Sequence, residues 1–233
     1  MSRQLLLEII PAPNPSLDNM VAGSNLPAID AARGLCAGRA LYVWGAAGSG
    51  KTHLLRGLAA AAGSQWIDSG SDPDEIAELA TGAPDTSFPR LVAIDDIHEM
   101  SESQLGGVFA LYNRWREQAA MESAFAVAVS GHRAPRMMEL REDLRTRLGW
   151  DLVFRLEPLS DSDKQAALAD YARRKGLPLT AELIAWMLTH YARDIRQLFA
   201  LVDALDRYSL SKHRAVTVPL LRAMLADREF LQS

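Results

Sequence analysis

The chain has 233 residues, of which 48% are hydrophobic, so it is long enough to bury a sizeable core and is globular in composition. Its formal net charge of −4 excludes an overall basic field that would hold nucleic acid strongly, and its single cysteine excludes an intramolecular disulfide. No apolar run approaches the ~18 residues that a bilayer-spanning helix needs. We therefore expect a cytoplasmic protein with no membrane partner and no strong direct DNA binding.

The N-terminal segment, residues 1–15, is predicted to be an extended tail. It carries a short apolar run, and the prolines at positions 11, 13 and 15 then forbid a helix. The positions of interest in this tail are Gln4, Leu5, Leu7 and Ile9. An alanine-rich first helix is expected over 25–35, ahead of the first strand.

The segment 45–52 matches the phosphate-binding P-loop pattern G-x-x-x-x-G-K-[ST]. It lies between an apolar strand, 41–44, and a helix predicted over 51–62. Backbone N–H groups of such a loop surround a phosphate, the lysine reaches the β- and γ-phosphates, and the threonine hydroxyl contacts Mg²⁺. An ordinary strand-to-helix turn would have no use for a lysine and a threonine at those places. The pattern predicts binding of ADP or ATP with Mg²⁺, without choosing between the two nucleotides. The expected nucleotide-binding residues are Gly45, Gly48, Ser49, Gly50, Lys51 and Thr52.

Further strands alternate with helices along the chain. The strands are predicted over 65–68, 91–94, 124–129 and 152–156. Asp72 is a helix N-cap followed by a proline, and Ser101 opens a capping box at the start of a long helix. This alternation predicts an α/β fold with a doubly wound parallel sheet, in which ligands bind at the carboxyl ends of the strands.

Two acids, Asp95 and Asp96, follow the apolar strand 91–94 as a Walker B pair would, and Asp95 with Thr52 is the expected Mg²⁺ site. Without the P-loop, two solvated acids at a strand end would be the better interpretation. Asp96 is one methylene shorter than the glutamate that often polarises the attacking water, so we expect weak intrinsic hydrolysis at most. Ser130, placed at the end of strand 124–129, can orient a water or the γ-phosphate.

Two arginines are candidates for function. Arg147 precedes a Gly-Trp turn, where it can reach the phosphate of a neighbouring molecule; the alternative is a surface residue on an arginine-rich helix. Residues 159–233 are predicted to form a small helical lid domain after an α/β domain over 16–158. Arg196 starts the third helix of that lid, where it either folds onto the nucleotide or is solvated.

The motifs together resemble the AAA+ module of the bacterial initiator DnaA. They are still more similar to the short DnaA homologues of the Hda family, which inactivate the initiator. The segments that carry the resemblance are 45–52, 91–96, 130–135, 146–150 and 194–198. The resemblance covers residues 16–233. It implies an AAA+ P-loop NTPase in which Ser130 is the first sensor, Arg147 the arginine finger and Arg196 the second sensor.

The tail resembles the peptides that bind the β sliding clamp of DNA polymerase III, with Ile9 in place of the last leucine. The resemblance therefore implies three partners: the DnaA initiator, the clamp on DNA, and a second copy in a homodimer. The implied function is regulatory. Docked on the DNA-loaded clamp, the chain would stimulate hydrolysis of DnaA-bound ATP through Arg147 and so prevent re-initiation. The alternative is a stand-alone remodelling ATPase or helicase-loader-like factor; a DNA-binding initiator fragment is disfavoured by the acidic balance.

Overall fold

The structure is a computed structural model that describes residues 13–82, 88–191 and 194–227. Pro15–Pro158 form one compact unit, and the chain from Leu159 onward belongs to a second. Within the described ranges, no helix has the length and apolar character needed to cross a membrane. The tail positions Gln4, Leu5, Leu7 and Ile9 lie outside the described residues.

The first unit is built on a five-stranded sheet with the strand order β2-β3-β4-β1-β5, and every pair of neighbours is parallel. The predicted doubly wound parallel sheet is confirmed. The strands are β1 (Ala40–Trp44), β2 (Ser64–Ile67), β3 (Leu91–Ile94), β4 (Ala126–Gly131) and β5 (Leu152–Arg155). Because β1 lies between β4 and β5, the direction of winding changes beside β1, which is where a ligand crevice forms in such sheets.

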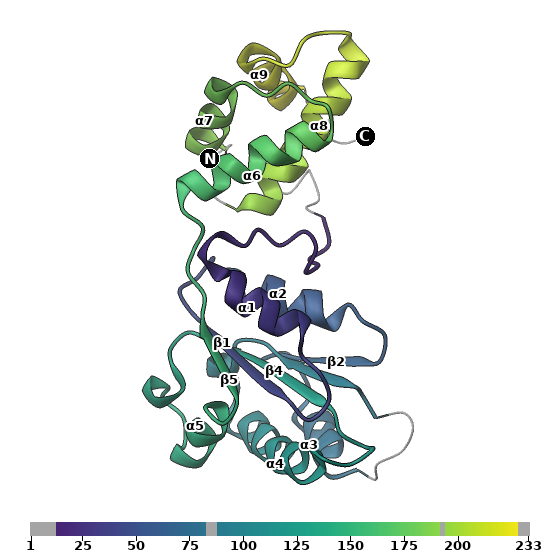
Figure 1. Cartoon of the computed structure of the whole chain (residues 1–233), viewed down its shortest axis with the longest axis vertical. Coiled ribbons are helices and arrows are strands. Elements are labelled where there is room, and N and C mark those ends of the chain that lie inside the picture. The colour runs from purple at the N-terminus through teal and green to yellow at the C-terminus, as the bar shows by residue number, and fades with distance from the viewer. Residues whose placement is uncertain (1–12, 83–87, 192–193, 228–233) are drawn as a thin grey trace. The chain divides into compact units, whose positions relative to one another are not determined.

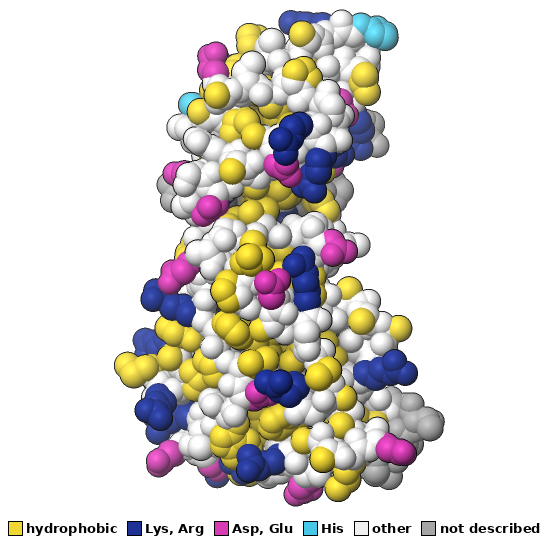
Figure 2. All heavy atoms as spheres, in the orientation of Figure 1, with side chains coloured by type: hydrophobic (Ala, Val, Ile, Leu, Met, Phe, Trp, Pro, Cys, Tyr) yellow, Lys and Arg dark blue, Asp and Glu magenta, His cyan; other side chains and the backbone are white. Residues whose placement is uncertain are grey.

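Helices cover both faces of this sheet (Figure 1). Helices α1 and α2 pack on one face, and α3, α4 and α5 pack on the other. The helical elements of this unit are η2 (Gly23–Asn25), α1 (Leu26–Arg33), α2 (Lys51–Ala59), α3 (Pro73–Thr81), η3 (Ile97–Glu99), α4 (Glu102–Gln118), η4 (Pro135–Met137) and α5 (Glu142–Leu148). Figure 2 shows acidic and basic side chains interspersed on the face in view, in keeping with the small net charge.

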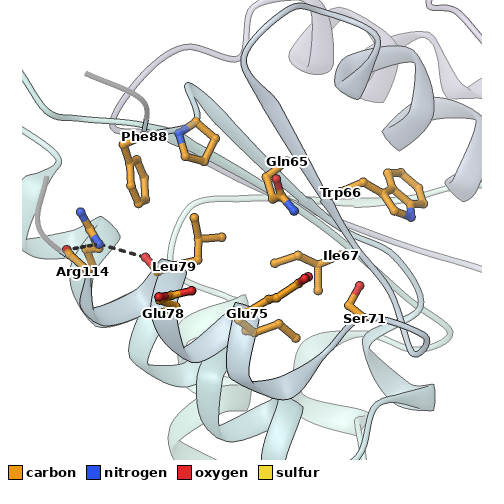
Figure 3. Close-up of a pocket in the computed structure, with 12 residues that line it drawn as sticks. Gln65, Trp66, Ile67, Ser71, Glu75, Glu78, Leu79, Phe88 and Arg114 are labelled. Atoms are coloured by element: carbon orange, nitrogen blue, oxygen red, sulfur yellow. Dashed lines mark hydrogen bonds between the residues drawn. The ribbon is translucent and has the colours of Figure 1, made fainter. Parts of the chain in front are cut away.

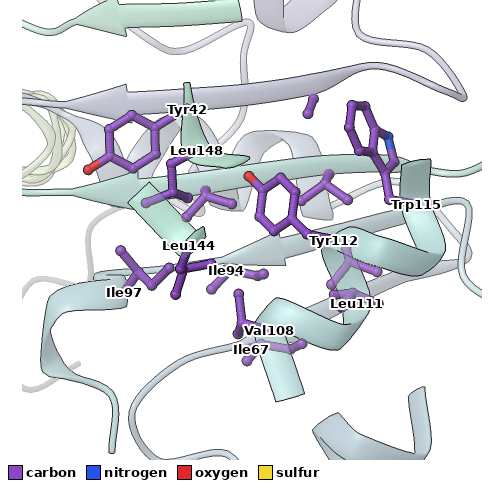
Figure 4. Packing of buried hydrophobic residues seen from close by; sticks show 14 of the residues in the cluster. Tyr42, Ile67, Ile94, Ile97, Val108, Leu111, Tyr112, Trp115, Leu144 and Leu148 are labelled. Atoms are coloured by element: carbon purple, nitrogen blue, oxygen red, sulfur yellow. The ribbon is translucent and has the colours of Figure 1, made fainter. Parts of the chain in front are cut away.

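Alternate residues of the buried strands serve the two faces. In β1, Leu41 and Val43 join the cluster under α1 and α2, whereas Tyr42 joins the cluster under α3, α4 and α5 (Figure 4). In that second cluster Tyr112 is almost completely buried, and burial raises the pKa of its hydroxyl. The sheet is therefore held rigidly from both sides, which fixes the positions of the loops at its carboxyl edge.

Local sequence signals set most helix starts. Asp72 caps α3 by accepting a hydrogen bond from Asp74 N, and Ser101 and Gln104 complete the capping box of α4. Several predicted boundaries are wrong. Helix α1 spans 26–33 instead of 25–35, β1 begins at 40 instead of 41, β2 spans 64–67 instead of 65–68, and β5 ends at 155 instead of 156. Helix α2 ends at Ala59 instead of residue 62, because the chain must turn before β2 starts at Ser64.

The predicted limits of the fourth strand are also wrong. Strand β4 begins at Ala126 and continues to Gly131, because its backbone stays paired with β1 as far as Trp44. Ser130 therefore lies inside the strand and opposite Val43. Its side chain is fixed by the sheet instead of by a loop.

The second unit has helices and no strand among its described residues. Its helices are α6 (Asp161–Arg174), α7 (Ala181–His190), α8 (Ile195–Lys212) and α9 (Val218–Ala226). A capping box at Ser160 opens α6, and Thr180, Asp194 and Thr217 cap the three others with their side chains. Helix α8 supplies the largest buried face, with Leu198, Leu201 and Leu205 fully enclosed.

Candidate nucleotide site

The P-loop connects β1 to α2 at the carboxyl edge of the sheet. Gly48 and Gly50 have φ angles of 77° and 94°, in the left-handed region that glycine adopts without strain. The loop also passes close to the chain after β5: a Cβ on Gly45 would lie 2.2 Å from the Leu156 carbonyl oxygen. Glycine is thus required here for two separate physical reasons.

Lys51 begins α2 and is only 9% exposed. Its ammonium group donates to the carbonyl oxygens of Gly45 at 3.0 Å and Ala46 at 3.2 Å, so it lies against the inside of the loop. The hydroxyl of Ser49 is buried without a hydrogen-bond partner among the described residues. The first turn of α2 adds unpaired N–H groups and the positive end of the helix dipole. A buried ammonium, an orphaned hydroxyl and a helix N-terminus together fit a phosphate group.

The two acids predicted as a Walker B pair lie close to Ser130. The register places Ile94 opposite Val129, so Asp95, directly after β3, lies beside Ser130 of β4. The Ser130 hydroxyl donates to Asp95 Oδ1 at 2.6 Å and accepts from Asp96 N at 2.8 Å. Both Ser130 and Asp95 are buried, with 0% and 7% exposure. Ser130 therefore orients the Asp95 carboxylate and the backbone after it.

Residues that can hold Mg²⁺ are few. Thr52 is exposed in the first turn of α2, and Asp95 is the nearly buried acid. No group of three or more His, Cys, Asp and Glu side chains in the described part of the chain can hold a metal ion. A small protein ligand set fits Mg²⁺, which keeps several waters and binds through one or two carboxylates together with substrate phosphates.

Asp96 has an unusual backbone, with φ 43° and ψ 55°. Next to it the rings of His98 and His132 are in contact, with their centroids 4.2 Å apart and their planes tilted by 43°, and His98 Nδ1 lies 3.9 Å from Asp96 Oδ1. The pKa of His132 is lowered, chiefly by burial and further by the charges of His98, Arg133 and Lys51.

Arg147 lies in the last turn of α5, against α4. Its guanidinium donates to Asn113 Oδ1 from Nε at 3.1 Å and from Nη2 at 2.7 Å, and to the Asp143 carbonyl oxygen from Nη1 at 3.1 Å. It also lies over the Phe109 ring, 3.8 Å from its centroid. All of these partners belong to α4 and α5, and none belongs to the P-loop.

Arg196 belongs to the second unit. Its Nη2 pairs with Asp194 Oδ2 at 3.0 Å, and its backbone N donates to Asp194 Oδ1 at 2.9 Å. Its side chain is 36% exposed. The structure therefore leaves the predicted contact of Arg196 with nucleotide as a prediction.

A cavity of about 640 Å³ lies elsewhere, between β2 and α3. Figure 3 shows Gln65 and Ile67 of β2 on the side of Glu75 and Leu79 of α3, whereas Trp66 points away from that helix. At one end, Arg114 donates from Nη1 to the carbonyl oxygens of Leu79 at 2.9 Å and Gly82 at 2.8 Å. No residue of the P-loop lines this cavity, so it is separate from the candidate phosphate site.

Known proteins resemble this chain in one segment of its sequence and in its fold. Residues 161–225 match the family described as Hda, lid domain. Domain III of the replication initiation protein DnaA from Thermotoga maritima has a similar structure. Its TM-score is 0.64 at 19% identity, over 96% of this chain and 100% of that one. AMPPCP-bound DnaA from Aquifex aeolicus is similar with a TM-score of 0.60 at 20% identity, over 85% of this chain and 67% of that one. The chain therefore has the AAA+ fold of DnaA domain III, and its residues 161–225 are similar to the Hda lid domain.

The same AAA+ fold is found in proteins other than DnaA. The Holliday junction branch migration motor RuvB from Thermotoga maritima has a TM-score of 0.62 at 15% identity, over 94% of this chain and 72% of that one. At such identities the likeness shows the fold alone. It confirms the predicted AAA+ architecture, in which a parallel α/β sheet is followed by a helical lid.

Sequence reasoning missed four residues at or beside the predicted site residues. His98 lies near Asp96 and contacts His132, and Asn113 and Phe109 hold Arg147. A signal existed for the second pair, because residues four apart in a helix share a face and α4 was predicted as a helix. The histidines come from two separate strand ends, so no local pattern joins them.

Proposed function

We propose that this chain is a nucleotide-bound regulator of the DnaA initiator. Docked on the β sliding clamp of DNA polymerase III on DNA, it stimulates hydrolysis of DnaA-bound ATP and so prevents re-initiation of replication. The observation that carries this proposal is the match of residues 161–225 to the Hda lid, in a chain whose fold is that of DnaA domain III. That pairing favours a protein of the regulator type.

The nucleotide is ADP or ATP, held with Mg²⁺. Its binding residues are Gly45, Gly48, Ser49, Gly50, Lys51 and Thr52, and Thr52 and Asp95 bind the metal ion. Support comes from the buried Lys51 ammonium inside the loop and the unpartnered Ser49 hydroxyl among the described residues. A relative, DnaA from Aquifex aeolicus, is known with the ATP analogue AMPPCP bound. Metal-bound phosphate chemistry needs such a positively charged, preorganised cradle.

Arg147 acts in trans on the ATP held by DnaA. An arginine finger is worth about 10³–10⁵ in the rate of phosphoryl transfer, so supplying one can switch the initiator without rapid turnover by the regulator. The position of Arg147 supports this role, because its contacts are with α4 and α5 and not with the P-loop of its own chain. Intrinsic hydrolysis stays weak because Asp96 is too short to replace the usual glutamate.

The remaining parts of the chain have supporting roles in this proposal. The tail, residues 1–15, binds the clamp through Gln4, Leu5, Leu7 and Ile9 in an extended conformation. Residues 16–158 form the nucleotide-binding domain and 159–233 form the lid. Ser130 and Arg196 sense the nucleotide from the sheet and from the lid. A homodimer through the Arg147 face competes with binding to DnaA.

The test is hydrolysis of labelled ATP bound to DnaA, in the presence of DNA-loaded clamp and a saturating amount of this protein. The variants are Arg147→Ala and a double variant with Gln4→Ala and Leu5→Ala. Arg145→Ala is the matched control, because it removes the same charge from the same helix two residues away. We expect the wild type and Arg145→Ala to accelerate hydrolysis and the other two to lose that effect.

Rapid hydrolysis of free ATP by the wild type, with no effect on DnaA-bound ATP, would overturn the regulatory proposal. The stand-alone remodelling ATPase would then replace it. Loss of activity in Arg147→Ala but not in the tail variant would keep the finger and remove the clamp-docking role of the tail.

A further inference from the structure

The cavity between β2 and α3 lies beside an open edge of the sheet. Among the described residues, β2 is the last strand of the sheet and pairs only with β3. The carbonyl oxygen of Ile67 accepts a hydrogen bond from Asp95 N, on the β3 side. Because the backbone polar groups of successive strand residues face alternate edges, those of Ser64 and Trp66 face the open edge. An edge of this kind can accept an added strand from another chain.

The exposed charge beside this cavity is negative. Helix α3 has nine residues, of which three are acids and none is Lys, Arg or His. Two of these acids, Glu75 and Glu78, are exposed and line the cavity, whereas the third, Asp74, does not line it. Arg114 lines the cavity as well, but it is only 7% exposed and its guanidinium holds the end of α3. The accessible charge therefore favours a positively charged ligand.

The floor of the cavity is apolar. Ile67 of β2 and Ile76 and Leu79 of α3 line it, and Figure 3 shows Ile67 on the side of Leu79. Its volume of about 640 Å³ lies within the range of about 300–1,000 Å³ that is usual for ligand pockets. A lysine or arginine side chain combines an apolar stem with a charged end. The stem can cover this floor while the charged end reaches the acids.

Helix α4 fixes the shape of the cavity. Gln104 Nε2 donates to the carbonyl oxygens of Ser69 at 3.1 Å and Ser71 at 2.7 Å, which holds the turn after β2. A Cβ on Gly107 would lie 2.6 Å from Ile76 Cγ2, so α3 packs closely on α4. Because α3 is fixed to α4, it is not free to close onto β2. A groove that is formed before binding lowers the ordering cost of binding.

We propose that the groove between β2 and α3 binds an extended, positively charged peptide segment of a partner protein. The segment adds to the open edge of β2 through backbone hydrogen bonds with Ser64 and Trp66. Every second side chain of the segment then points toward α3, where a lysine or arginine pairs with Glu75 and Glu78. This inference does not rest on the proposed regulation of DnaA, because neither the P-loop nor Arg147 takes part in it.

The probe is a fluorescein-labelled heptapeptide, blocked at both ends, in which arginine alternates with valine. Binding to the full chain is followed by fluorescence anisotropy, and a matched peptide with glutamate in place of arginine is the charge control. We expect the wild type to bind the arginine peptide and not the glutamate peptide. The double variant Glu75→Gln and Glu78→Gln should bind the arginine peptide about fivefold more weakly or worse. Asp74→Asn is the control variant, because it removes an acid of the same helix outside the cavity, and its affinity should stay within about twofold of the wild type.

A further variant, Ser64→Pro, tests the open edge itself. Proline is tolerated at the first residue of a strand and on an edge whose N–H groups face solvent, so the circular dichroism spectrum should stay that of the wild type. The variant lacks one N–H donor for an added strand, and its affinity for the arginine peptide should fall about fivefold. In the wild type, hydrogen exchange of the amides in 64–66 should become slower when the arginine peptide is bound, and exchange in the lid should not change.

Several results would overturn the proposal. One is the absence of binding up to about 1 mM arginine peptide, and another is equal binding by the wild type and the double variant. Slower exchange confined to residues outside β2 would place the peptide elsewhere. Release of a self-associated form by the peptide would assign the groove to a second copy of this chain. None of these measurements uses DnaA or the clamp, so failure of this proposal and failure of the proposed function are distinguishable.

Discussion

Replacing Ser130 with alanine is expected to destabilise the first unit more than the removal of a hydroxyl that makes no hydrogen bonds. The Ser130 hydroxyl is fully buried, donates to Asp95 Oδ1 at 2.6 Å and accepts from Asp96 N at 2.8 Å. A hydrogen bond to a charged group contributes about 1.5–3 kcal/mol net, and a buried N–H left without an acceptor costs about 1–3 kcal/mol. Since these terms overlap, the expected loss in free energy of unfolding is about 3 kcal/mol.

The assay is urea unfolding followed by tryptophan fluorescence. Trp44, Trp66, Trp115 and Trp150 lie in the first unit, so the signal reports mainly on that unit. With a urea dependence of about 2 kcal/mol per molar, a loss of about 3 kcal/mol lowers the midpoint by roughly 1.5 M.

Ser49→Ala is the matched control. It removes the same hydroxyl from a residue that is 4% exposed, but that hydroxyl has no hydrogen-bond partner among the described residues. The free energy of unfolding of Ser49→Ala should therefore stay within about 0.5 kcal/mol of the wild-type value. Equal losses in Ser130→Ala and Ser49→Ala would refute the reasoning, because burial alone would then account for the effect.

Three further predictions concern glycines and one histidine. Gly45→Ala should weaken binding of a fluorescent ATP analogue at least tenfold, because its Cβ would lie 2.2 Å from the carbonyl oxygen that follows β5; unchanged affinity would contradict this contact. In α4, Gly107→Ala should lower the free energy of unfolding by about 1–3 kcal/mol, since its Cβ would lie 2.6 Å from Ile76 Cγ2. A Cβ at Gly106 would meet nothing within 4 Å, so Gly106→Ala should raise the free energy of unfolding by about 0.5–1 kcal/mol. Calorimetry that found Gly107→Ala more stable than Gly106→Ala would contradict the close packing of Gly107 against Ile76. The lowered pKa of His132 means that the folded state binds its proton less readily than the unfolded chain; the associated stability is complete above the ordinary value of about 6.5 and is lost as pH falls through the lowered pKa. His132→Gln should therefore flatten the fall in melting temperature between neutral and mildly acidic pH, and an unchanged slope would assign that fall to other groups.

The sequence predicts best those elements whose signals are local. The bounds of β3, 91–94, are predicted correctly, because an uninterrupted apolar run suits a strand buried on both faces. The caps Asp72 and Ser101 are correct too, because a capping bond joins residues that are near one another in the chain.

Elements whose limits depend on distant neighbours are predicted less well. A Ser-Gly pair is typical of a turn, yet in β4 pairing with β1 continues the strand through Ser130 and Gly131. Three alanines favour a longer α2, but the chain must turn before β2 at Ser64.

In the candidate site, too, local sequence signals were predicted and contacts between distant segments were not. The P-loop, the acid pair and Ser130 were predicted as one group, and the structure brings Asp95 and Ser130 into contact. The contact between the rings of His98 and His132 could not be predicted, because it depends on how two strand ends meet in space. Interactions of this kind become visible only when the sheet register is known.

The backbone at Asp96 also limits how this protein can change. Its left-handed conformation suits short side chains such as aspartate and asparagine, which can bond locally, and disfavours most longer ones. A designer who replaced Asp96 with glutamate to obtain a fast ATPase would add the missing methylene and, by the same change, strain the peptide that carries it. The backbone conformation at Asp96 would thus oppose this substitution, and a single codon change would not be enough to turn the slow hydrolysis that we expect into fast hydrolysis.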